Sequence, residues 1–293
     1  MKAIILIPAL VSTLVAQDQA PPTLSQKAKA ETPVINKLLA DFDGKEALAK
    51  AEAMIPANKP EFDKSSPAKG IASSSEYAAL MSIYTLAGKA AVAYGDWDKS
   101  VGYLRRAKEI AQENAAGTTI ALAPAIDMWK KAESAGKAYI EEGAARRKEL
   151  QEKATRTESE EVELKNFKTH ENNVKQGPVA VTQLQGILDG LKDDADHFDG
   201  PISGIEKSIK SEKDQIDSPQ FKGDKIKYVN AVMNPSNLES RATKADKISF
   251  VSRLLFLDPN NKKAQKQMDV LLGKAPAEPE KKAPSKSKKQ KGN

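Results

Sequence analysis

The sequence predicts an all-helical protein from three observations. Aromatic residues make up only 5% of the 293 residues, and alanine and lysine are abundant, a composition that suits helices better than a β-sandwich. Apolar residues recur at steps of three and four through most of the chain. Cysteine is absent, which excludes disulfides, thiolate zinc sites and a cysteine nucleophile. We expect an all-α fold, an irregular array of helical hairpins with a long charged helical insertion.

The beginning of the chain has the features of a secretory signal peptide. One lysine precedes an apolar run from Ala3 to Ala16 that is too short to span a bilayer and ends on a small residue. We expect residues 1–16 to be a signal peptide, with an uncleaved anchor as the alternative. The protein would then be periplasmic or secreted, with no transmembrane span in the mature chain. Residues 17–31 carry two consecutive prolines without an apolar period and are expected to form a flexible lead-in.

The first helical hairpin is expected from residue 32 onward. Thr32 can cap a helix that has Pro33 at its first position. Gly44 separates this helix from a second one, which Pro56 ends. Residues 56–72 contain three prolines and are expected to form a long loop.

A second hairpin is expected from Ser73 to Ala111. Ser73 and Glu76 have the spacing of a capping box, which indicates that a helix starts there. Apolar residues share one face of this helix until the tight connection formed by Gly95, Asp96 and Trp97, after which the same periodicity resumes. Because the connection is short, the two helices must lie antiparallel.

This hairpin resembles one tetratricopeptide repeat unit, at 81–114. The residues that match the family pattern of aromatic, small and large apolar positions are Tyr84, Gly88, Gly95, Trp97, Ser100, Leu104 and Ala107. The small residues let the two backbones approach, and the large ones fill the space around them. Gln112 stands where the family has a closing proline. Partial matches lie near 32–56 and 238–272.

The repeats are not regularly spaced. Ala51, Ala107 and Leu254 occupy corresponding positions but are separated by 56 and 147 residues, whereas the family period is about 34. The 32–274 region is therefore expected to be a repeat-like domain interrupted by an insertion at about 118–176. Acid-first pairs four residues apart, such as Glu149 with Lys153, predict that this insertion is one long helix projecting from the body.

Shorter segments are expected after the insertion. Gly177 and Pro178 mark its end, and the segment from Lys225 to Met233 is ambiguous between helix and strand. Ser236 and Glu239 form a second capping box, which predicts the start of the next helix. Residues 258–261 break that helix before a final capping helix closed by a glycine.

Catalytic and metal-binding patterns are sparse. The acidic stretch at 193–200 begins like a calcium loop, but Phe198 and Ile205 stand where oxygen ligands belong. Two serine-x-x-lysine pairs, at Ser66 and Ser134, lack the companion motifs of the penicillin-recognising family. We expect no catalytic residue, no cofactor and no metal, so the chain is not predicted to be an enzyme.

The resemblance implies a non-catalytic scaffold that binds a protein or peptide partner through its hairpins. Four tyrosines are candidates either for the core or for a partner-binding face: Tyr77, Tyr84, Tyr94 and Tyr103. The alternative is a structural cell-envelope protein that uses the long charged helix for spacing or oligomerisation.

The net charge of +6 is concentrated at the end of the chain. Residues 275–293 carry six lysines against two glutamates and are expected to be a disordered tail. The lysines between Lys281 and Lys291 are either simply solvated or attach the protein to an anionic envelope surface. Nucleic acid is not an expected partner of an exported protein.

Overall fold

The computed structural model describes residues 23–274, and this part of the chain forms helices and no strand, which confirms the all-α class. The predicted signal peptide, the first residues of the lead-in and the lysine-rich tail lie outside the described residues. The helices are α1 (Leu24–Ala40), α2 (Gly44–Met54), α3 (Pro67–Tyr94), α4 (Trp97–Glu142), α5 (Ala144–Glu152), α6 (Glu158–Asp196), α7 (Asp199–Ile216), α8 (Lys225–Val232), α9 (Pro235–Glu239), α10 (Lys244–Leu257) and α11 (Lys262–Leu271).

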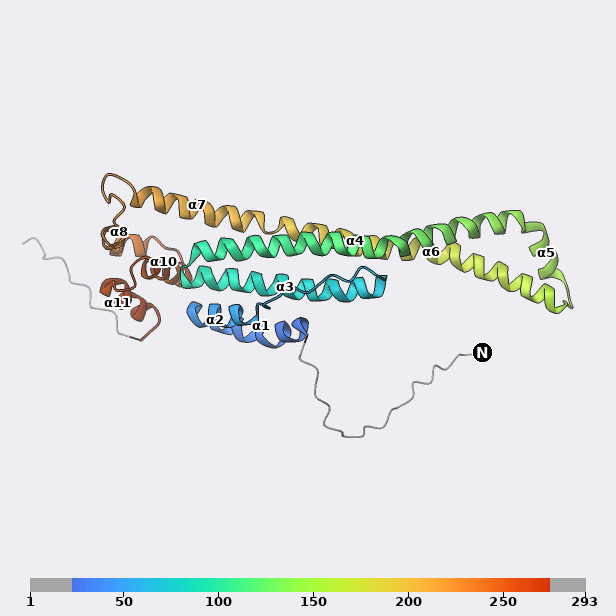
Figure 1. The fold of residues 1–293 in the computed structure, drawn as a ribbon, viewed down its shortest axis with the longest axis horizontal. Helices are drawn as coiled ribbons and strands as arrows, with labels where there is room; N and C mark the ends of the chain where they lie inside the picture. The colour runs from blue at the N-terminus through green and yellow to red at the C-terminus, as the bar shows by residue number, and fades with distance from the viewer. Residues whose placement is uncertain (1–22, 275–293) are drawn as a thin grey trace, which may run out of the picture.

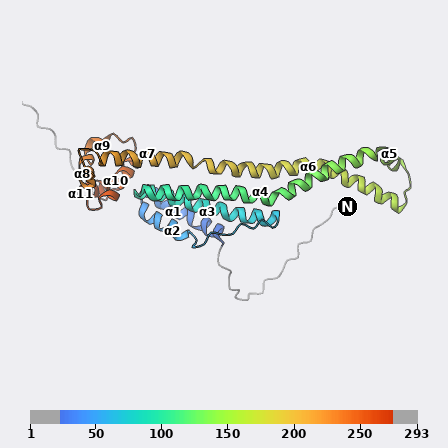
Figure 2. The same ribbon diagram turned by 45° about the horizontal axis from the view of Figure 1, so that its top comes forward.

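The molecule is long and narrow, with α4 as its central element (Figure 1). Helix α6 and its continuation α7 run antiparallel along one side of α4, and α3 packs against another side. Helices α1 and α2 cover the far side of α3. Both views place α5 at one end of the molecule and α8 to α11 at the other (Figure 2).

The first helix begins earlier than predicted. Thr23, not Thr32, is the N-cap, because its side chain accepts from the backbone N–H of Gln26 in a capping box. Glu76 of α3 also accepts a hydrogen bond from the backbone N–H of Leu24, at 3.0 Å. This hydrogen bond to α3 stabilises the start of α1 at Leu24. The prediction of a flexible segment is therefore wrong for residues 24–31.

Helix α3 also begins before its predicted start. Ser66 caps it, and Pro67 occupies the first turn. Ser73 instead accepts from the backbone N–H of Asp63 at 3.0 Å, and Glu76 serves α1. The predicted capping box is wrong because both side chains bind other segments.

The predicted single helix at 118–176 is instead an antiparallel hairpin. Helix α4 continues through Pro124 to its end at Glu142, α5 forms the turn, and α6 returns through Pro178 without a break. We call residues 124–178 the arm. Gly136 lets the two long helices approach, since a Cβ there would lie 2.9 Å from the backbone oxygen of His170.

The C-terminal segments form a compact group of short helices. The ambiguous segment from Lys225 is helix α8. The helix predicted to start at Ser236 is split into α9 and α10, because Thr243 and Asp246 form the capping box that starts the longer helix. The predicted break at 258–261 is confirmed, and Asn261 caps α11.

Candidate functional site: an apolar groove beside the α3–α4 hairpin

The tight connection of the hairpin forms as predicted. Gly95 ends α3 with a φ of +99°, a left-handed conformation that favours glycine. Asp96 caps α4 by accepting from the backbone N–H of Lys99 at 3.1 Å. A Cβ on Gly95 would lie 2.6 Å from the backbone oxygen of Ser252, so the turn is in contact with α10.

The residues that carry the family resemblance lie at the contact between α3 and α4. Gly88, Ser100, Leu104 and Ala107 are buried there, and a Cβ on Gly88 would lie 2.9 Å from Leu104 Cδ2. The helices of this hairpin have 28 and 46 residues, more than a repeat of about 34 residues can hold. Membership of the repeat family stays a prediction.

An apolar groove with a volume of about 470 Å³ opens beside this hairpin. One wall is a face of α3, the floor is α4, and the other wall is the joint between α6 and α7. The side chains that define these three surfaces are Thr85, Lys89, Val92, Ser100, Leu104 and Phe198. A concave, mainly apolar site with a few polar groups is the usual form of a binding site.

Ser100 is the unusual residue of this groove. It is 0% exposed, and within residues 23–274 its hydroxyl has no hydrogen-bond partner. A buried hydroxyl without a partner costs about 1–3 kcal/mol and calls for an explanation. Ser100 borders the groove, but its hydroxyl is closed to solvent, so a bound molecule would have to displace neighbouring side chains to reach it.

Two basic side chains stand at the rim of the groove. Lys89 is exposed, and within residues 23–274 no acidic group forms an ion pair with it. His197 is also exposed, and its Nδ1 donates to the backbone oxygen of Asp193 at 2.7 Å. The rim therefore favours a neutral or acidic occupant.

The four tyrosines do not share one exposed face. Tyr77 is 4% exposed and donates its hydroxyl to the backbone oxygen of Pro60. Tyr84 is half-buried beside Tyr103, and Tyr94 makes an edge contact with an aromatic ring of α10. Tyr77, Tyr84 and Tyr103 thus pack between helices, whereas Tyr94 is 36% exposed, and other residues form the groove.

Glu52 explains the position of Tyr103. Its carboxylate accepts from the Tyr103 hydroxyl at 2.5 Å and from Lys99 Nζ at 2.7 Å, which ties α2 to α4. Hydrogen bonds from Lys99 and Tyr103 lower the pKa of Glu52. Burial and the hydrogen bond to Glu52 raise the pKa of Tyr103 well above its usual range. Tyr103 therefore stays protonated and structural.

A buried ion pair that the sequence did not indicate lies at the turn of the hairpin. Arg253 of α10 donates Nε to both oxygens of Glu212 in α7, at 3.1 and 3.0 Å, and Nη1 to the backbone oxygen of Gly95 at 2.7 Å. Its guanidinium lies 4.5 Å from the Trp97 ring centroid. Trp97 thus packs against a cation.

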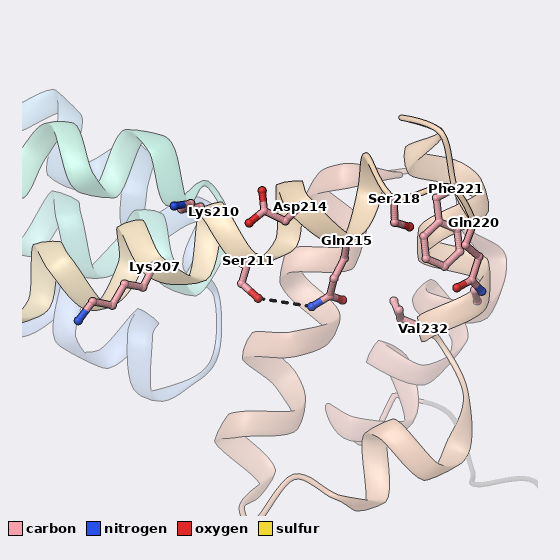
Figure 3. Close-up of a pocket in the computed structure, with 10 residues that line it drawn as sticks. Lys207, Lys210, Ser211, Asp214, Gln215, Ser218, Gln220, Phe221 and Val232 are labelled. Atoms are coloured by element: carbon pink, nitrogen blue, oxygen red, sulfur yellow. Dashed lines mark hydrogen bonds between the residues drawn. The ribbon is translucent and has the colours of Figure 1, made fainter.

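Two further cavities border α7. One, of about 740 Å³, is lined by the Arg253–Glu212 pair and neighbouring serines. The other, of about 720 Å³, lies between α7 and α8, where Ser211 and Gln215 are hydrogen-bonded (Figure 3). The polar side chains of this second cavity are mostly exposed, and water can satisfy them.

Within residues 23–274, no three His, Asp or Glu side chains are placed to hold a metal ion. Ser66 is the N-cap of α3, and the lysine that follows Ser134 in its motif is paired with Glu133. His170 stacks on Tyr139 in the arm.

Spacing along α3 could have predicted one wall of the groove, since Thr85, Lys89 and Val92 follow each other at helical steps. The opposite wall comes from residues about a hundred positions later, which only the tertiary structure places there.

No described helix is both long enough and apolar enough to cross a membrane. Comparisons with protein-family models, with characterised proteins and with solved structures find no match for this chain.

Proposed function

We propose that the protein is an exported, non-catalytic helical scaffold that binds an amphipathic segment of a partner protein in the groove between α3, α4 and the α6–α7 joint. The observation that carries the proposal is the apolar groove itself, with Lys89 at its rim lacking an acidic partner among the described residues. Export rests on the apolar segment at residues 1–16.

The chemistry of the groove defines the segment that would fit. Apolar side chains of Val92, Leu104 and Phe198 favour an apolar anchor residue. Lys89 at the rim favours an acidic residue, because no described acidic group neutralises it.

Site-specific photocrosslinking in intact cells tests this proposal. A benzophenone side chain at Val92 should crosslink one protein at a defined segment. The same group at Val34, which is 42% exposed on α1, should not. With that partner purified, Val92→Glu should lower the affinity at least about tenfold, because it places an unpaired carboxylate against apolar side chains. Val34→Glu is the matched control and should bind normally.

Two results would contradict the proposal. One is equal crosslinking from both positions, and the other is unchanged affinity of the Val92→Glu variant when its helix content equals that of the control.

A second candidate function is spacing or oligomerisation through the arm. The arm has a small core of its own, formed by Leu150, Leu164 and Phe167 at its tip. It also extends away from the groove (Figure 1). A benzophenone placed at the exposed Lys148 would then crosslink two copies of the chain to each other. If the protein acts only through the groove, a benzophenone at Lys148 should not crosslink two copies of the chain.

A further inference from the structure

The charge of the molecule is strongly divided along its length. Residues 225–274, which form α8 to α11, carry ten Lys or Arg against four Asp or Glu, a net charge of +6. Residues 23–224 carry 29 Lys or Arg against 33 Asp or Glu, a net charge of −4. Helices α8 to α11 lie together at the end opposite α5 (Figure 2). The described molecule therefore has one strongly basic end.

Most cations of this end have no acidic partner within the described residues. Arg253 is the exception among them that forms a buried ion pair, with Glu212, and Lys266 also has an interaction partner. Eight cations of the basic end have no acidic partner among the described residues: Lys225, Lys227, Arg241, Lys244, Lys247, Lys262, Lys263 and Lys274. Such a concentration of unpaired charge creates a positive field that attracts an anionic surface.

An apolar side chain stands among these cations. Ile226, between Lys225 and Lys227 at the start of α8, is 59% exposed. It is the most exposed large apolar side chain of the described residues. An apolar residue flanked by lysines suits the boundary between lipid headgroups and acyl chains, where the isoleucine can enter while the ammonium groups meet phosphates.

We infer that the α8–α11 end docks the protein on an anionic lipid bilayer as a peripheral protein, with Lys225, Ile226 and Lys227 at the contact. Charge complementarity supplies most of the attraction, and Ile226 distinguishes a bilayer from a soluble polyanion. The groove lies on a different part of the molecule, so this inference is independent of the proposed partner. It also assigns the attachment to the folded end and not only to the lysines at 281–291.

Vesicle flotation with the full-length chain tests the inference. The protein should float with vesicles of phosphatidylcholine and phosphatidylglycerol, but not with phosphatidylcholine alone, and high salt should release it. The double variant Lys225→Gln/Lys227→Gln should lower the partition coefficient about 25-fold, since each lysine near an anionic surface contributes about fivefold. Ile226→Ser should weaken vesicle binding but leave binding to soluble polyphosphate unchanged.

The matched control variant removes two positive charges from the arm instead of from α8. Lys165 and Lys168 are exposed on the arm, so Lys165→Gln/Lys168→Gln should bind vesicles as the unmodified chain does. Equal loss in this control would overturn the inference, because it would show an effect of net charge alone. Loss only when the six tail lysines become glutamine would overturn it too. Insensitivity of vesicle binding to Ile226→Ser would point to a soluble polyanion instead.

Discussion

At the scale of single residues, Gly95 is constrained in two ways. Its φ of +99° lies in the left-handed region, which costs other residues roughly 1–2 kcal/mol. Its missing side chain also leaves room for α10, since a Cβ would lie 2.6 Å from Ser252 O and 3.0 Å from Arg253 Cα. The turn glycine of the hairpin thus has two roles, of which only the first was apparent from the sequence.

Gly95→Ala should therefore lower the free energy of unfolding by more than about 2 kcal/mol, because backbone strain and a backbone clash add. Gly102→Ala is the matched control. Gly102 lies in the interior of α4 with no atom within 4 Å of an added Cβ, so alanine should stabilise the protein by about 0.5–1 kcal/mol. Urea unfolding followed by circular dichroism measures both values. A Gly95→Ala variant as stable as Gly102→Ala would disprove this account of the turn.

At the scale of the elements, the arm depends on contacts at its tip. Thr157 and Glu160 form the capping box that starts α6. Glu160 also pairs with Lys153 Nζ at 2.6 Å and Arg146 Nη2 at 3.5 Å, so one carboxylate joins α5 to α6. Hydrogen bonds from Lys153 and from the backbone of Thr157 lower the pKa of Glu160 from 4.5 to about 2.

This lowered pKa predicts how the arm responds to acid. The ionised Glu160 stabilises the folded state at any pH above its unfolded pKa of 4.5, and the effect disappears as the pH falls toward about 2. Glu160→Gln should therefore reduce stability near pH 7 and make no difference near pH 2. Thermal unfolding over a pH series tests this. Glu158→Gln, in the same helical turn, is the control and should have the smaller effect at pH 7. A stability difference that is independent of pH would contradict the assignment.

At the scale of the whole molecule, one buried arginine joins three distant segments. Arg253 in α10 bonds to Glu212 in α7 and to the backbone of Gly95 at the α3–α4 turn. The pair is almost fully buried, with 6% and 10% of its side chains exposed. It therefore holds the basic C-terminal helices against the body of the molecule.

Removing one member of this pair should be costly. Glu212→Leu leaves the guanidinium of Arg253 buried without its counter-charge and should lower the free energy of unfolding by about 3–5 kcal/mol. Combining it with Arg253→Met removes both charges and should recover part of that loss. A double-mutant cycle by urea unfolding measures the difference. If the two single effects simply add, the pair is not coupled and another contact holds α10 in place.

The sequence by itself determined the helical class and several boundaries of this protein, whereas the tertiary structure decided its shape and its sites. The break at 258–261 and the hairpin turn at Gly95 depend on caps and backbone conformations within about four residues, so the sequence alone could predict them. Thr32 was the predicted cap of the first helix, but Thr23 caps it, and a hydrogen bond to distant Glu76 supports this earlier start. Continuous helices through Pro124 and Pro178, the groove and the Arg253 junction depend on packing between segments far apart in the chain. Local patterns cannot contain that information, because the burial that selects among them arises only when those segments meet.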